Sequence, residues 1–87
     1  MINELTIPHN PKEPSDLQML HEFLSYHMDM EERKVTVISG TGWKFQFEGE
    51  DAIDMTVDLE ITIPAMKSHK IIKGSTNLVV TIETPEE

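Results

Sequence analysis

The side chains of this sequence that could do chemistry are its histidines and its carboxylates, because it contains no cysteine. His21 and His27 stand in a segment that we expect to be helical. Six residues of a helix turn through about 600°, so these two side chains point about 120° apart and cannot share one metal ion. His27 also falls among the apolar residues of that segment. We expect a core or partly buried histidine bonded to a backbone group or a threonine hydroxyl, with a pH-sensitive packing residue as the alternative.

The acidic residues give no catalytic or metal-binding pattern. Asp58 and Glu60 could form a pair for general acid–base chemistry, but we expect them on a solvated strand face, where nothing tunes a carboxyl group for proton transfer. The acidic stretch 48–54 lacks the spacing of a calcium-binding loop. The sequence therefore assigns no catalytic residue, no metal ligand and no cofactor, and enzyme activity is the disfavoured class.

Gly40 and Gly42 form a G-x-G pair between two expected strands. A glycine-rich loop that cradles phosphate should follow a strand and open a helix. This loop leads from strand to strand, so we interpret it as a hairpin turn.

Two stretches, 43–48 and 53–63, alternate apolar and polar residues, which is typical of strands with one buried and one solvated face. The apolar face of the first comprises Trp43, Phe45 and Phe47. The apolar face of the second comprises Met55, Val57, Leu59, Ile61 and Ile63. On the opposite face, Asp54, Asp58 and Glu60 should form a regular row of negative charge, because alternate strand residues lie about 6.7 Å apart.

Residues 15–31 are expected to form the only helix. Ser15 at the N-cap and Gln18 three residues later have the spacing of a capping box. The apolar residues fall in two adjacent stripes, Leu17, Leu20, Leu24 and Met28 in one and Met19, Phe23, Tyr26 and Met30 in the other. This surface is wider than a helix on a sheet requires, so we expect either deep packing against a curved sheet or contact with another chain. The candidates for that contact are Met19, Tyr26 and Met30.

The whole chain is predicted to be one α+β domain with the element order β-α-β-β-β-β. It comprises a strand with a proline-containing connector (1–14), the helix (15–31), an antiparallel meander (33–84) and a frayed tail (85–87). The helix should pack across one face of a four- to five-stranded antiparallel sheet. Cystatin-like folds have a similar order of elements, which is an analogy of arrangement alone. The predicted core comprises Leu20, Leu24, Phe45, Phe47, Leu59 and Ile61.

The net charge of −9 disfavours nucleic acids and anionic membranes as partners, because both require positive potential on the protein. The first seven residues contain no basic or long apolar run, so neither a signal peptide nor a membrane span is expected. The lack of cysteine suits a reducing compartment, which makes the cytoplasm the default location. A protein with a basic surface is the partner that the charge favours, although solubility alone would also explain the acidity.

We interpret the sequence as a small, acidic, non-enzymatic interaction module that binds another protein and modulates or inhibits it. A more specific version is a nucleic-acid-mimicking decoy of the kind that phages use. The candidate protein-binding residues are Glu48, Glu50, Asp51, Asp54, Asp58 and Glu60. One alternative is a structural subunit of a homodimer or larger homo-oligomer, assembled through the helix flank or a strand edge. A small-molecule binder or an enzyme is less favoured.

Overall fold

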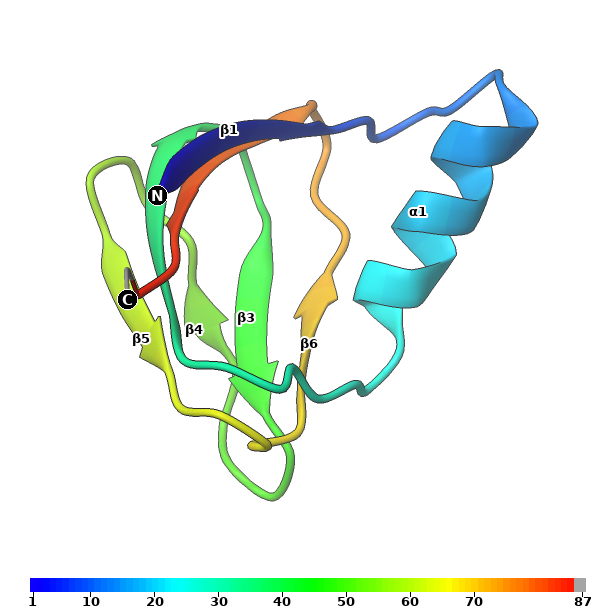
Figure 1. Cartoon of the computed structure of the whole chain (residues 1–87). Helices are drawn as coiled ribbons and strands as arrows, with labels where there is room; N and C mark the ends of the chain where they lie inside the picture. The colour runs from blue at the N-terminus through cyan, green and yellow to red at the C-terminus, as the bar shows by residue number, and fades with distance from the viewer. Residues whose placement is uncertain (86–87) are drawn as a thin grey trace.

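The computed structural model describes residues 1–85, which form one helix and seven strands (Figure 1). In chain order the elements are β1 (Ile2–Ile7), α1 (Pro14–Leu24), β2 (Arg33–Ser39), β3 (Lys44–Phe47), β4 (Ile53–Asp54), β5 (Glu60–Ile63), β6 (His69–Ile72) and β7 (Leu78–Glu83). The predicted α+β class with antiparallel strands is confirmed. Within the described residues, no helix is long and apolar enough to cross a membrane. The predicted frayed tail lies mostly outside them.

The strands divide between two sheets instead of forming the single meander that we expected from the sequence. The larger sheet has the order β1-β7-β2-β5 and the smaller one β4-β3-β6, and every pairing is antiparallel. The first and last strands pair along their whole length, from Ile2 opposite Glu83 to Ile7 opposite Leu78. Because β7 lies between β1 and β2, successive hairpins alone do not describe this fold.

The core lies between the two sheets, since its buried residues come from both. Val37, Trp43 and Leu78 are the most completely buried large side chains. Trp43 also donates its indole N–H to the carbonyl of Thr76 at 2.6 Å, which satisfies the polar atom of a buried ring. The predicted core residues all belong to this cluster, with Leu20, Phe45 and Ile61 buried and Leu24, Phe47 and Leu59 partly buried against it.

A turn interrupts the predicted strand from 53 to 63, which corrects the sequence interpretation. Its two ends, β4 and β5, pair in different sheets. Asp58 in the turn has a φ of 72°, a left-handed conformation that a strand does not contain. Its N–H donates to the carbonyl of Val37 at 2.8 Å. Val57 is consequently 55% exposed instead of facing the core.

The helix is shorter than predicted. Glu13 is the N-cap and makes no side-chain capping bond, while Pro14 starts the helix at a position where its missing N–H needs no partner. The capping box expected at Ser15 is therefore wrong. The helix ends at Leu24, because the backbone is extended at Ser25, and residues 25–31 contain no further helix.

The helix lies beside the two sheets and does not cross a sheet face (Figure 1). It contacts β6 and β1, and Leu20 is its one fully buried residue. Met28 and Met30, which the sequence placed on the helix, lie in the following loop and are exposed. Much of the helix surface is therefore left to solvent.

Candidate functional site

The acidic residues predicted to bind a protein are all exposed, but they do not form one face. Asp54 belongs to the smaller sheet, Glu60 to the larger one and Asp58 to the turn between β4 and β5. The regular row of charge expected along one strand is therefore not formed. The remaining three, Glu48, Glu50 and Asp51, follow β3 in the chain. A binding role for these six residues stays a prediction.

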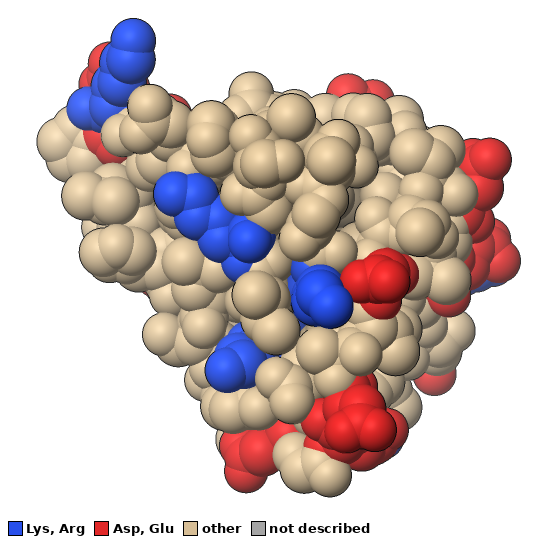
Figure 2. All heavy atoms as spheres, turned by 180° about the vertical axis from the view of Figure 1, so that it is seen from behind, with Lys and Arg blue, Asp and Glu red and all other residues tan. Residues whose placement is uncertain are grey.

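Lysines approach three of these carboxylates and divide the negative surface. The ion pairs are Lys44 with Asp54 at 3.3 Å, Lys34 with Glu60 at 3.3 Å and Lys67 with Glu50 at 3.0 Å. Figure 2 shows basic side chains across the middle of the rear face and acidic side chains along its lower and right-hand edges. Exposed pairs of this kind contribute little to stability. They do interrupt the continuous negative field that a nucleic-acid mimic requires.

The three residues predicted to contact a second chain lie in different settings. Met19 is half-buried on α1, Tyr26 follows the helix, and Met30 is 89% exposed in the loop. The ammonium group of Lys70 lies 4.6 Å from the centroid of the Tyr26 ring. Because the helix ends before two of the three, they do not share a helical stripe. A role in dimerisation also stays a prediction.

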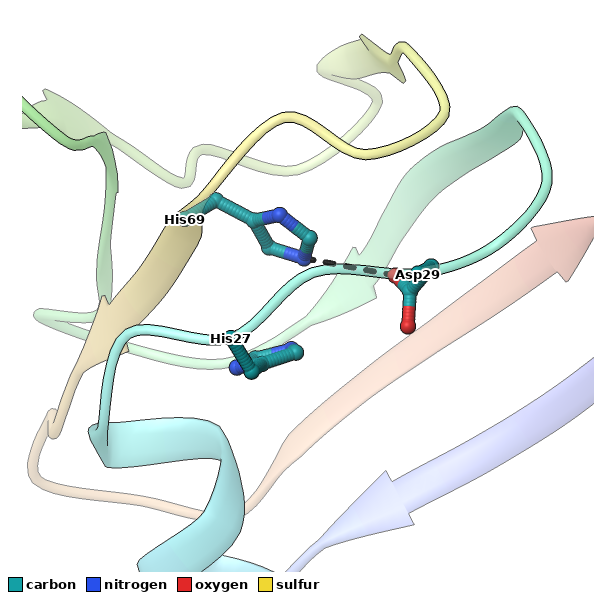
Figure 3. Close-up of side chains that lie close together, drawn as sticks. All are labelled: His27, Asp29 and His69. Atoms are coloured by element: carbon teal, nitrogen blue, oxygen red, sulfur yellow. Dashed lines mark ion pairs between the residues drawn. The ribbon is translucent and has the colours of Figure 1, made fainter.

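A pair of histidines joins the loop after α1 to the start of β6. The backbone N–H of His27 donates to the carbonyl of His69, and the N–H of His69 donates to the carbonyl of His27, both at 3.0 Å. Figure 3 shows the two rings on the same side of this bridge, with the carboxylate of Asp29 beside them. We call His27, Asp29 and His69 the His–Asp cluster.

Apolar side chains fix the orientation of the two imidazole rings. The rings lie 4.4 Å apart between centroids. Phe23 meets the His27 ring edge-on at 5.9 Å, and Phe45 stacks on the His69 ring at 5.6 Å. Only 4% of His69 is exposed. This packing holds two polar rings at the margin of the core.

Each imidazole turns Nδ1 toward a backbone carbonyl. Nδ1 of His27 lies 2.8 Å from the carbonyl oxygen of Ser25, and Nδ1 of His69 lies 2.8 Å from that of Lys67. A carbonyl oxygen only accepts hydrogen bonds, so each Nδ1 carries the hydrogen. In the neutral ring, Nε2 then keeps a free lone pair.

Asp29 connects the histidines to Arg33. Its Oδ2 lies 3.4 Å from Nε2 of His69, and its Oδ1 lies 3.6 Å from Nη1 of Arg33. Its backbone carbonyl accepts a hydrogen bond from Met66 at 2.8 Å, which anchors the loop. Nε of Arg33 is buried and has no hydrogen-bond partner among the described residues.

Burial lowers the pKa of His69 below the ordinary value of 6.5. Positive charge at His27 and at Arg33 lowers the pKa further. The hydrogen bond to the Lys67 carbonyl and the negative charge of Asp29 raise it. The 3.4 Å between Nε2 of His69 and Oδ2 of Asp29 would suit an ion pair with a protonated ring. Burial has the largest effect, however, so the neutral ring is favoured at neutral pH.

The His–Asp cluster has the composition of a cation site. One ring nitrogen of each histidine and a carboxylate oxygen of Asp29 lie within 4.8 Å of one another. A small cavity of about 50 Å³ adjoins all three residues and Arg33. Such a group of atoms can share a proton or hold a metal ion.

An open groove of about 850 Å³ lies between α1 and the loop that follows it, and we call it the helix groove. Its lining includes the apolar side chains Leu17, Phe23 and Tyr26 and the charged side chains Glu22, Asp29 and Arg33. Leu17 is 44% exposed and Tyr26 is 40% exposed. His27 and Asp29 line the groove too, so the His–Asp cluster is reached from it.

The sequence interpretation missed both the His–Asp cluster and the helix groove. It did predict a partly buried His27 bonded to a backbone group, which the contact with Ser25 confirms. His69 is far away in the chain, and no fixed spacing connects it to His27. Comparisons of the chain with protein-family models, with characterised proteins and with solved structures gave no match.

Proposed function

We propose that this chain is a non-enzymatic protein-binding module whose docking surface is the helix groove. The observation that carries the proposal is the exposed apolar wall formed by Leu17 and Tyr26. Leu20 is the one buried residue of the helix, and Phe23 and Leu24 are partly buried against the core. Leu17 is therefore the apolar position that the helix leaves to a partner. Aromatic side chains in such grooves supply much of the binding energy between proteins.

A protein segment suits the helix groove better than a small molecule does. The groove is open to solvent, whereas sites for small molecules enclose most of the ligand surface. Its wall carries Glu22, for which the structure gives no ion-pair partner among the described residues. The net charge of the chain is −9. The partner should therefore present an apolar side chain flanked by lysine or arginine, and its capture would modulate that partner's own contacts.

The proposal is tested with two sets of short fluorescent peptides that share a central Leu, Phe or Trp. One set has lysine and arginine on both sides of it, and the other has glutamate. We expect tighter binding of the basic set, with a difference that shrinks as salt rises because screening weakens the attraction. Equal binding of both sets, or no binding of either, would contradict the proposal.

Matched variants locate the binding. Leu17→Ser and Tyr26→Ser should each lose at least about 1 kcal/mol of binding free energy, roughly fivefold in affinity. Val57→Ser is the control, because Val57 is similarly exposed but lies in the turn between β4 and β5. Loss of binding in the control alone would move the docking surface away from the groove.

The free edge of β1 favours a homodimer as the second candidate function. β1 is an outer strand of the larger sheet, and among the described strands it pairs only with β7. An unpaired strand edge is a template for pairing with another chain. Ile2 on this strand is 67% exposed. Sedimentation equilibrium over a wide concentration range decides between the two candidates, because a monomer at all concentrations excludes the homodimer.

Two further proposals concern a decoy role and the location of the chain. A nucleic-acid-mimicking decoy would use the acidic residues of the surface, among them Asp54, Asp58 and Glu60, which lie in two sheets and in the turn between β4 and β5. For location, we propose the cytoplasm, because a chain without cysteine suits a reducing compartment. Fluorescence microscopy of a tagged chain in its native cell tests that proposal.

A further inference from the structure

The ring of His69 has a hydrogen-bond acceptor at both of its nitrogens. The carbonyl oxygen of Lys67 lies 2.8 Å from Nδ1, and Oδ2 of Asp29 lies 3.4 Å from Nε2. A neutral imidazole has one N–H and satisfies one of these acceptors. At the other nitrogen, a lone pair faces an oxygen lone pair. A cation between Nε2 and Oδ2 would remove this conflict.

We propose that His27, Asp29 and His69 form a binding site for a divalent transition-metal ion, with Zn²⁺ as the expected ion. Two imidazole nitrogens and one carboxylate oxygen are a common set of three protein ligands for zinc, with water in the fourth position. This inference goes beyond the proposed docking function and does not depend on it. Binding at the helix groove and binding of metal are measured separately.

The spacing of the ligand atoms fits such an ion. Zinc–ligand bonds of about 2.0 Å in a tetrahedral arrangement place the ligand atoms roughly 3.3 Å from one another. Nε2 of His69 and Oδ2 of Asp29 are 3.4 Å apart. One ring nitrogen of His27 lies within 4.8 Å of these two atoms, so His27 would move toward them when the ion binds. The adjoining cavity of about 50 Å³ has room for a water molecule.

The hydrogen-bond partners of the two Nδ1 atoms also match a metal site. In proteins, a histidine that binds metal usually donates its other ring N–H to a carbonyl or carboxylate, which fixes the tautomer and the ring orientation. The carbonyls of Ser25 and Lys67 occupy that position for His27 and His69. The Nε2 atoms are then the ones available to the ion. The open side of the cluster, through the helix groove, supplies the entry path.

Among residues 1–85, Arg33 is the cation that contacts Asp29 and would compete with a metal ion. Its Nη1 lies 3.6 Å from Oδ1 of Asp29, while Oδ2 faces His69. The guanidinium therefore contacts the carboxylate oxygen that the metal does not need. Its charge should weaken metal binding without blocking it. Asp29 in turn disfavours an anion in the same place.

The test is a titration of the metal-free, ¹⁵N-labelled wild-type protein with ZnCl₂, followed through the imidazole nitrogen resonances. The chain has 4 histidines, and we expect two of them to change, at Nε2, with saturation at one equivalent of zinc. Their Nδ1 atoms should keep their hydrogens. No change, or equal changes at every histidine, would overturn the proposal. This measurement needs no substitution, so it cannot be confused with misfolding.

A matched pair of variants assigns the ligands. His27→Gln should remove one of the two responding rings and weaken zinc binding at least about tenfold, since even loss of a partner outside the ligand set weakens metal sites by roughly 10–100-fold. His21→Gln is the control, because His21 is an exposed residue of α1 outside the cluster. It should bind zinc as the wild type does. Full affinity in folded His27→Gln, or an equal loss in His21→Gln, would overturn the assignment.

Discussion

His27 and His69 exchange two backbone hydrogen bonds of 3.0 Å each, and this pairing fixes the loop after α1 to the first residue of β6. The loop forms one wall of the helix groove, and α1 forms the other. The same pairing brings the two imidazole rings together beside Asp29. One short bridge between distant parts of the chain therefore positions both the docking groove and the His–Asp cluster.

The lowered pKa of His69 predicts a loss of stability in mild acid. The unfolded chain takes up a proton near the ordinary pKa of 6.5, whereas the folded chain does so only at lower pH. The stability that the neutral ring contributes is therefore present above the ordinary value and is lost as the pH falls from there through the lower pKa of the folded chain. Urea unfolding of the metal-free protein from about pH 8 to about pH 5 measures this.

His69→Gln is the comparison for that experiment. Carboxylates also titrate in acid, but they do so in both proteins, so their effect cancels when the two unfolding free energies are subtracted. The difference in unfolding free energy between the wild type and His69→Gln should shrink as the pH falls. A difference that grows toward acid would mean that the protonated ring is stabilised, with Asp29 outweighing burial.

The two-sheet core predicts a sharp contrast between two apolar residues. Leu78→Ala should cost about 2–5 kcal/mol, because Leu78 is completely buried between the sheets. Val57→Ala should change stability by no more than about 0.5 kcal/mol, because Val57 is exposed in the turn before β5. Chemical denaturation measures both. A large loss of stability in Val57→Ala would mean that Val57 is buried, as the unbroken strand 53–63 predicted from the sequence requires.

The observed helix start changes the expectation for Ser15. With Glu13 as the N-cap and Pro14 at the first turn, Ser15 lies inside the helix and caps nothing. Ser15→Ala should therefore be neutral within about 0.5 kcal/mol. A loss of about 1 kcal/mol in urea unfolding is the typical effect of removing an N-cap, and it would place the helix start at Ser15 after all.

Gly74 should tolerate a side chain less well than Gly49. A Cβ atom at Gly74 would collide with the carbonyl of Thr41 and the ring of Trp43, and overpacking of this kind typically costs about 1–3 kcal/mol or more. A Cβ atom at Gly49 would meet nothing within 4 Å. Its φ of 83° leaves only the backbone strain of a left-handed residue, about 1–2 kcal/mol. Thermal melts of the two alanine variants should rank in that order, and the reverse ranking would contradict the packing around Trp43.

The buried strand faces could be predicted from the sequence because alternation of apolar residues reports burial directly. Trp43, Phe45 and Ile61 are all buried, as that pattern predicts. The break at Asp58 could not be predicted, because its neighbours alternate as a strand would. The turn is held by the hydrogen bond from Asp58 to the carbonyl of Val37, a contact that exists only once the sheets have formed.

The His–Asp cluster and the helix groove could not be predicted from the sequence for a related reason. Helical periodicity placed His27 on a helix face, whereas the helix ends at Leu24 and leaves His27 in an extended bridge. Its partner His69 lies in the stretch 33–84 that was predicted to be an antiparallel meander. Neither a spacing nor a composition signal connects two residues that meet only through tertiary packing. The helix groove likewise depends on where the loop returns to β6.

The most direct measurement of the docking proposal is a ¹H–¹⁵N shift map of the wild-type protein with the tightest basic peptide. The amides that should move and broaden together are those around the groove, at Leu17, Phe23 and Tyr26, while the amide of Val57 in the turn before β5 stays in place. Shifts confined to the acidic residues 48–51, or to β4 and β5, would contradict the account and would place the binding surface on the carboxylates instead.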